Sequence, residues 1–321
     1  MKAIVCTRYG PPEVLKLREV KKPVPKNNEA LIKVYASSVT AGDCRIRSFT
    51  WPKWFWLPGR LMFGFTKPRK QIPGWELSGE IESVGKNVRS FKKGDKVFGF
   101  NKGMSFGGTN AEYKCLDEGR LVRLYLTKMS YEEAAVLPIG GLTALHFLRK
   151  ADTRSGQKVL IYGASGSVGT YAVQLAKHFG AVVTGVCSSK NFKLVKSLGA
   201  DYLVDYTRED FTKQGKIYDI IFDTVGKISF SHCKASLRDN GIYTTVDWPI
   251  LQTIWTSLTG NKKIIMGMAP DKTEDLIYLK ELVETKKLLP VIDKFFPMEQ
   301  AVEAYRYVDT GHKRGNVVIT P

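Results

Sequence analysis

The most constraining feature of the sequence is a short glycine-rich segment, residues 163–169, that stands between a strand pattern and a helix pattern. The apolar run Lys158–Tyr162 precedes it, and apolar residues then recur at helical spacing from Val168 to Phe179. Strand, glycine-rich turn and helix in this order form the context that the dinucleotide-binding fingerprint requires. Slim residues let the backbone approach a pyrophosphate, and the helix N-terminus offers N–H groups and a positive dipole end to the anion. The predicted contacts are Gly163, Ala164, Ser165, Gly166, Ser167 and Val168.

One residue departs from the strict motif, because Ala164 stands where the pattern has its first glycine. A glycine-rich turn that only packs a helix against a strand therefore remains an alternative.

The residues after the next predicted strand, 181–186, indicate the type of coenzyme. Sites that prefer NAD carry Asp or Glu there to hold the ribose hydroxyls. Here Cys187 is followed by Ser188, Ser189 and Lys190, so the sequence shows no carboxylate at this place to repel a 2′-phosphate. We predict NADP (NADPH) as the coenzyme, with these two serines and the lysine as contacts. A solvated loop is the alternative interpretation.

The chain of 321 residues suits about two domains. Residues 1–122 contain closely spaced strand patterns, among them 30–36, 79–85 and 94–100, which predict a β-rich, barrel-like domain. From residue 123 strands alternate with helices, with later strands expected at 217–223 and 241–246, which predicts a parallel sheet covered by helices. A helix near 298–310 and a strand at 316–319 follow.

Composition excludes several classes of protein. No apolar run approaches the roughly 18 residues that span a bilayer, and the first residues do not form a signal peptide, so a cytoplasmic location is the default expectation. The five cysteines are widely spaced, which supports neither a disulfide framework nor a structural zinc cluster. The net charge of +18 permits attraction to phosphates, nucleic acid or an anionic membrane.

Several separate segments resemble one superfamily. They are residues 73–85, 94–97, 134–144, 163–169 and 315–319. In this order they resemble the medium-chain dehydrogenase/reductase superfamily, on its quinone oxidoreductase side. The resemblance covers essentially the whole chain. It implies an α/β protein with a GroES-like β-barrel catalytic domain (1–122, completed by 266–321) and a Rossmann doubly wound parallel sheet (123–265), with the active site in the cleft between them.

The resemblance also bears on metal binding. Zinc alcohol dehydrogenases of this superfamily hold a catalytic metal with cysteine and histidine, and the matching positions here are Thr40, Trp75 and Ile139. None of these offers the thiolate or imidazole that zinc prefers. The histidines, His146, His178, His232 and His312, stand apart from the motifs and are expected to be packing or surface residues. We therefore predict no metal.

Residues 39–47 resemble the stretch that lines the nicotinamide in quinone reductases. The family usually has Asn where this chain has Thr40, and Tyr where it has Arg45. Thr40 is the first candidate for a catalytic hydrogen-bond donor and also a coenzyme contact, and Arg45 is the second candidate donor. A cation at position 45 makes a polar or anionic acceptor conceivable. Asp43 and Arg47 match the family, and a structural ion pair between them is an equal alternative.

The same resemblance extends the list of coenzyme contacts. Tyr206 is expected near the adenosine 2′-phosphate. Relatives often carry a phosphate-binding lysine at what is here Asn191, and Lys190 or Lys193 can substitute. The further predicted contacts are Gly141, Thr143, Val225 and Asn316. For each of them, plain packing without a role in coenzyme binding is the alternative.

Hydride transfer without a metal needs an acceptor that spreads negative charge onto oxygen, because the coenzyme carries the chemistry and the protein supplies orientation and a water-poor site. We therefore expect an oxidoreductase that uses NADPH to reduce a quinone or an α,β-unsaturated carbonyl. An alcohol dehydrogenase or carbonyl reductase of the same superfamily is one alternative, and a nucleic-acid-binding protein that uses the basic surface is another. The expected partners are a small-molecule hydride acceptor and a second copy in a homodimer, with no nucleic acid.

Residues 51–70 combine aromatic and basic side chains, and no acid occurs from Cys44 to Trp75. Three interpretations compete: a hydrophobic lid over the substrate, ordinary packing between domains, and a weak contact with an anionic membrane.

Overall fold

The computed structural model describes residues 1–51, 55–101, 103, 105–246, 261–270 and 272–321. The chain forms two compact units, Met1–Ile139 with Ile292–Pro321, and Gly140–Val291. The first unit thus extends further than residue 122 and resumes later than residue 266. Helix α3 (Tyr131–Ala135) packs on strands of the first unit, and α9 (Thr273–Glu284) packs in the second, which accounts for both shifts.

The first unit is rich in strands, as the sequence predicted. A sheet in the order β14-β15-β3-β4-β5-β7, with β6 paired to β3, forms its body, and β1 pairs with β2. The strands are β1 (Lys2–Cys6), β2 (Leu15–Glu19), β3 (Glu29–Ser38), β4 (Glu76–Val84), β5 (Lys96–Phe100), β6 (Tyr113–Asp117), β7 (Leu121–Arg123), β14 (Ile292–Pro297) and β15 (Asn316–Thr320). The helices are α1 (Ala41–Ser48), α2 (Trp56–Phe63), α3 and α10 (Ala301–Asp309).

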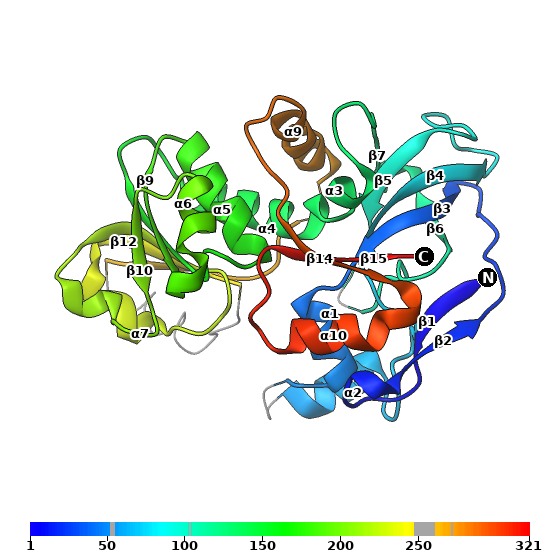
Figure 1. Cartoon of the computed structure of the whole chain (residues 1–321), viewed down its shortest axis with the longest axis horizontal. Helices are drawn as coiled ribbons and strands as arrows, with labels where there is room; N and C mark the ends of the chain where they lie inside the picture. The colour runs from blue at the N-terminus through cyan, green and yellow to red at the C-terminus, as the bar shows by residue number, and fades with distance from the viewer. Residues whose placement is uncertain (52–54, 102, 104, 247–260, 271) are drawn as a thin grey trace. The chain divides into compact units, whose positions relative to one another are not determined.

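Both ends of the chain build this unit. Strand β15 pairs antiparallel with β3, so the last strand lies beside one of the first (Figure 1). Helix α10 buries Tyr305 and Val308 in the same core as Ile4, Cys44 and Phe63. The C-terminal segment thus returns to the first unit.

The second unit is a parallel sheet in the order β10-β9-β8-β11-β12-β13. Its strands are β8 (Lys158–Tyr162), β9 (Val182–Cys187), β10 (Tyr202–Asp205), β11 (Tyr218–Asp223), β12 (Leu237–Thr245) and β13 (Lys263–Ile265). Its helices are α4 (Leu137–Lys150, which begins in the first unit), α5 (Ser167–His178), α6 (Phe192–Ser197), α7 (Phe230–Cys233) and α9. The strand order reverses between β8 and β11, which is the doubly wound Rossmann arrangement that the sequence predicted.

The apolar run of β8 follows from burial on both faces of this sheet. Leu160 belongs to a core with Phe211 and Phe230, whereas Phe147 of α4 meets Phe222 with ring centroids 5.4 Å apart. A strand covered on both sides reads as continuous hydrophobic sequence. None of the described helices is both long and apolar enough to cross a membrane.

Candidate functional site

The glycine-rich loop connects β8 to α5 at the carboxyl end of the strand. Gly163 has a φ of +82°, a conformation that favours glycine. A Cβ on Gly169 would lie 2.1 Å from the Gly163 carbonyl oxygen, so the first turn of α5 lies directly against the loop. No described side chain caps this helix at Gly166. A tight bend and an uncapped helix N-terminus are the features that an anionic pyrophosphate uses.

One predicted contact outside the loop, Val225, lies beside it, and so does Gly140, the neighbour of the predicted contact Gly141. A Cβ on Gly163 would come within 2.7 Å of Val225, which places Val225 against the start of the loop. Asp223 holds the Val225 turn, because its Oδ1 accepts hydrogen bonds from the Val225 and Gly226 N–H groups. A Cβ on Gly140, next to the predicted contact Gly141, would lie 2.8 Å from the Ser167 hydroxyl oxygen. The loop, the Val225 turn and the start of α4 therefore lie close together. The predicted contact Thr143 is half-buried in α4.

The residue that joins the loop to the second strand end is Asn191. Its Nδ2 donates to the Ser165 Oγ at 3.0 Å and to the Ser188 Oγ at 3.4 Å. Asn191 is buried, and its Oδ1 has no hydrogen-bond partner among the described residues. Sequence reasoning considered this position only as the place where relatives carry lysine. Its signal was a polar residue in the short segment between β9 and α6, and the structure shows it connecting two predicted contacts.

The remaining predicted contacts here are accessible, since Ser189, Lys190 and Lys193 are exposed. A carboxylate that the sequence analysis did not place also lies here. Asp205 ends β10 beside Cys187, and its Oδ2 accepts from the Ser189 N–H at 3.1 Å. A hydrogen bond from the Thr207 side chain is the main reason that the pKa of Asp205 falls to about 2. The segment after β9 carries no carboxylate of its own, but the fold brings Asp205 of β10 beside it, and both Asp205 oxygens accept hydrogen bonds from protein donors.

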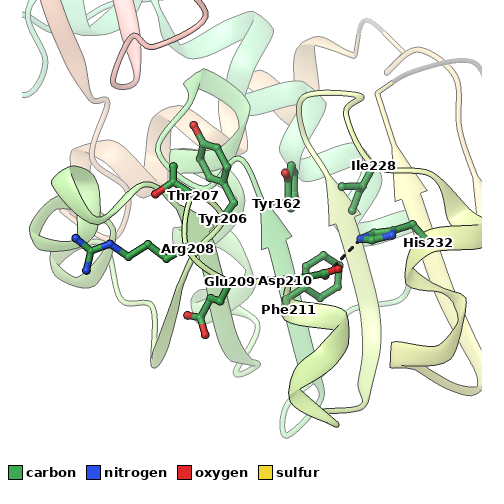
Figure 2. Close-up of a pocket in the computed structure, with 9 residues that line it drawn as sticks. All are labelled: Tyr162, Tyr206, Thr207, Arg208, Glu209, Asp210, Phe211, Ile228 and His232. Atoms are coloured by element: carbon green, nitrogen blue, oxygen red, sulfur yellow. Dashed lines mark ion pairs between the residues drawn. The ribbon is translucent and has the colours of Figure 1, made fainter.

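Tyr206 follows Asp205 and lines a cavity of about 360 Å³ at the same end of the sheet (Figure 2). Tyr162 from the end of β8 and Ile228 from the segment after β11 contribute to its wall. His232 lies with its Nε2 3.4 Å from the Asp210 Oδ1, so this histidine is paired rather than isolated. The lining sets one permanent cation, Arg208, against the two carboxylates Glu209 and Asp210, so this cavity by itself has no excess of positive charge for a phosphate. Arg208, whose side chain is 80% exposed, is a nearby cation that sequence reasoning missed.

Two predicted residues of the first unit, Thr40 and Arg45, belong to α1 and its N-cap. Thr40 is the N-cap of this helix: its Oγ1 accepts from the Asp43 N–H and donates to the Asp43 Oδ2 at 2.7 Å. The hydroxyl hydrogen of Thr40 is thus engaged within the protein. Arg45 is exposed, with its guanidinium 5.6 Å from the centre of the Trp51 ring. Asn316 is buried at the start of β15.

The alternative ion pair between Asp43 and Arg47 is wrong. Arg47 is buried and pairs with Asp309 of α10, with the guanidinium NH2 2.7 Å from Asp309 Oδ2. Asp43 instead accepts from Thr40 and from the Gly74 N–H at 2.8 Å. Asp43 and Arg47 lie one turn apart on α1 but interact with different segments. Arg47 reaches Asp309 because α10 packs against α1.

The positions that match metal ligands lie together in the first unit. A Cβ on Gly42 would lie 2.8 Å from the Trp75 ring and 3.4 Å from the Thr40 Oγ1. The Ile139 N–H donates to the Glu76 Oε2 at 2.7 Å, and Ser38 donates to the other carboxylate oxygen. Burial raises the pKa of Glu76 to about 7. Across the described residues, no group of three or more His, Cys, Asp and Glu side chains could hold a metal ion.

The chain is similar to known proteins over its whole length. Residues 26–126 match the alcohol dehydrogenase GroES-like domain, and residues 198–319 match the zinc-binding dehydrogenase family. The chloroplastic quinone oxidoreductase QR1 of Triphysaria versicolor is 35% identical, over 100% of this chain and 98% of its own length. The solved quinone oxidoreductase of Coxiella burnetii is 32% identical with a TM-score of 0.90, over 100% of this chain and 99% of its own.

The chain belongs to the quinone oxidoreductase-like branch of the medium-chain dehydrogenase/reductase superfamily. The chloroplastic NADPH-dependent alkenal/one oxidoreductase of Arabidopsis thaliana is a further relative, 29% identical over 100% of this chain and 80% of its own length. The resemblance stated from the motifs is confirmed, as are the GroES-like and Rossmann components.

Proposed function

We propose that this member of the quinone oxidoreductase-like branch is an NADPH-dependent oxidoreductase that passes hydride to a quinone or an α,β-unsaturated carbonyl. The observation that carries the proposal is the slim bend from Gly163 into α5, which packs tightly at Gly169 and begins the helix with no described side-chain cap. That end of the helix favours the diphosphate of a dinucleotide. The names of relatives that act on quinones and alkenals support the choice of acceptor.

NADPH is preferred over NADH in this proposal because of the groups at the end of β9. Ser188 and Ser189 offer hydroxyls, Lys190 and Lys193 are exposed cations, and Arg208 adds a third. Asp205 is a carboxylate placed beside them; its oxygens accept hydrogen bonds from Ser189 and Thr207, and the Arg208 guanidinium lies 3.8 Å from its Oδ2. A 2′-phosphate is bound most strongly by such charge-assisted donors.

The transfer proposed here proceeds without a metal. The coenzyme supplies the hydride, and the chain's own task is to hold the acceptor and exclude water. Thr40, Trp75 and Ile139 provide neither thiolate nor imidazole at the positions where zinc-dependent relatives hold their ion. Because the Thr40 hydroxyl donates to Asp43, it must turn away from that carboxylate before it can donate to an acceptor oxygen.

Two measurements test the proposal. Calorimetric titration should show binding of NADPH at least tenfold tighter than that of NADH. An NADPH-oxidation screen over quinones, enals, enones and aldehydes, run on protein dialysed against EDTA, should give turnover with quinones or enones. Absence of binding by either coenzyme would refute the proposal, and activity restored only by added zinc would refute its metal-free part.

A further inference from the structure

Helix α2 carries apolar side chains on the side that faces solvent. Trp56, Leu57 and Leu61 are 52%, 55% and 54% exposed, Met62 is 46% exposed, and Phe65 just beyond the helix is 56% exposed. A surface helix of a globular protein normally turns charged or polar residues outward. These five residues, called the α2 patch below, therefore form an apolar surface that the fold of this unit leaves uncovered.

The inner side of the same helix already anchors it. Phe63 is buried and stacks on Trp51 with ring centroids 5.6 Å apart, and a Cβ on Gly59 would lie 3.0 Å from the Phe49 ring. The Arg60 guanidinium lies 3.9 Å from the centre of that Phe49 ring. The helix is thus held by its inner face, and the α2 patch is not needed to attach it.

Positive charge borders the α2 patch. Lys67, Arg69 and Lys70 are all exposed, and the sequence has no acidic residue from Cys44 to Trp75. A second copy of this chain, with its net charge of +18, would present the same cations to this surface and be repelled. An anionic surface would be attracted. Tryptophan with aliphatic side chains and flanking lysine or arginine is the composition of segments that lie in the interface of an anionic bilayer.

We propose that the α2 patch docks the protein on anionic membranes, with its apolar side chains in the headgroup region and Lys67, Arg69 and Lys70 on the lipid phosphates. Lys53 and Trp54, which belong to the same basic and aromatic segment, lie outside the described residues. Binding through one short helix is reversible and depends on salt, because exposed charges are screened. The α2 patch shares no residue with the proposed coenzyme contacts, so the tests of membrane binding and of NADPH binding can fail independently.

Co-sedimentation of the full chain with lipid vesicles tests the proposal. Vesicles of phosphatidylcholine with about one third phosphatidylglycerol should carry the protein down at low salt and release it at high salt, and vesicles of phosphatidylcholine alone should not carry it. Leu57→Ser/Leu61→Ser should weaken the partition at least tenfold. The matched control Val24→Ser/Phe295→Ser removes two apolar side chains that are 78% and 59% exposed elsewhere in the unit, and should bind like the parent.

Two variants that each remove three cations distinguish binding by the α2 patch from attraction by the overall charge of the protein. Lys67→Gln/Arg69→Gln/Lys70→Gln should weaken binding strongly. Lys86→Gln/Lys92→Gln/Lys93→Gln removes as many exposed cations near the turn between β4 and β5, at the end of the unit away from α2 (Figure 1), and should change binding little. Equal loss in both variants would overturn the proposal in favour of general electrostatic attraction.

Thermal unfolding, kinetics and the oligomeric state test three other roles for the α2 patch: internal packing, a lid over the substrate and a contact between subunits. If Leu57→Ser/Leu61→Ser melts well below the parent, the patch is packed inside the protein and the proposal fails; Met62→Ser/Phe65→Ser repeats the vesicle test on a second pair. A changed KM for the acceptor with unchanged vesicle binding would identify a lid instead. Conversion of a dimer to a monomer by either pair would identify a subunit contact.

Discussion

At the residue scale, the sharpest question is what decides between NADPH and NADH. Ser188 is half-buried at the end of β9, and Asn191 holds its hydroxyl beside that of Ser165. The coenzyme's ribose is therefore expected to meet a hydroxyl at this point, with lysines close by. A single acid introduced at Ser188 would stand next to the existing charge of Asp205.

Ser188→Asp should raise the KM for NADPH at least tenfold and lower that for NADH, because a carboxylate repels the 2′-phosphate and can hold the ribose hydroxyls. Steady-state kinetics with both coenzymes measure the change. Ser197→Asp, on an exposed position of α6, provides the control for added negative charge and should leave both KM values unchanged. A parallel rise in both KM values for Ser188→Asp would show damage to the site rather than discrimination.

Gly166 and Gly169 of the loop differ in how much space they leave for a side chain, and alanine variants at the two positions test this difference. Gly169→Ala should cost about 1–3 kcal/mol of unfolding free energy, because its methyl would lie 2.1 Å from the Gly163 carbonyl oxygen. Gly166→Ala would meet that same oxygen only at 3.4 Å and has an ordinary φ of −81°, so it should be tolerated. Urea unfolding of the two variants compares them directly. Equal stability would contradict the close approach of α5 to the loop.

At the scale of elements, Glu76 ties β4 to the chain at Ile139. Its carboxylate is fully buried between the Ser38 hydroxyl and the Ile139 N–H, so burial favours the protonated form. Protonated Glu76 can donate to the Ser38 oxygen while the other carboxyl oxygen still accepts from Ile139. A glutamine can make the same two hydrogen bonds without ever carrying charge.

Glu76→Gln should therefore remove part of the pH dependence of stability. The pKa of this group rises from 4.5 in the unfolded chain to about 7 in the native protein, so the native state binds the proton more tightly. Wild-type stability is then lost as pH rises through this window, by at most about 3 kcal/mol at 1.36 kcal/mol for each unit of pKa. The variant should match wild type near pH 4, below the unfolded pKa, and exceed it near pH 8 in urea unfolding. A difference between the two proteins that does not change with pH would count against this account.

At the scale of the whole molecule, coenzyme binding should be visible as stability. A ligand that binds only the native state stabilises it by about 2.7 kcal/mol at about 100 times its Kd. The Rossmann unit should consequently melt about 5–10 °C higher with saturating NADPH. Differential scanning calorimetry with NADPH and then NADH measures the shift. Ser188→Asp should lose most of the NADPH effect, and an unshifted wild-type transition would argue against a coenzyme site in this unit.

Much of this organisation was legible in the sequence because it depends on local pattern. The bounds of β8 agree with the predicted strand, and α5, β9 and β15 agree within a residue. Burial on both faces gives a continuous apolar run, and a tight turn before a helix demands slim residues, so each leaves a direct trace in the order of amino acids. The family resemblance followed from motifs of this kind.

What only the tertiary structure decided were pairings between segments distant in sequence. Arg47 pairs with Asp309, Ser189 lies over Asp205, and Asn191 joins Ser165 to Ser188. The spacing of these residues in the sequence does not predict the contacts, because each contact depends on how two separate elements pack together. The glycine bend, by contrast, is set by backbone sterics within seven consecutive residues, and so the sequence alone determined it.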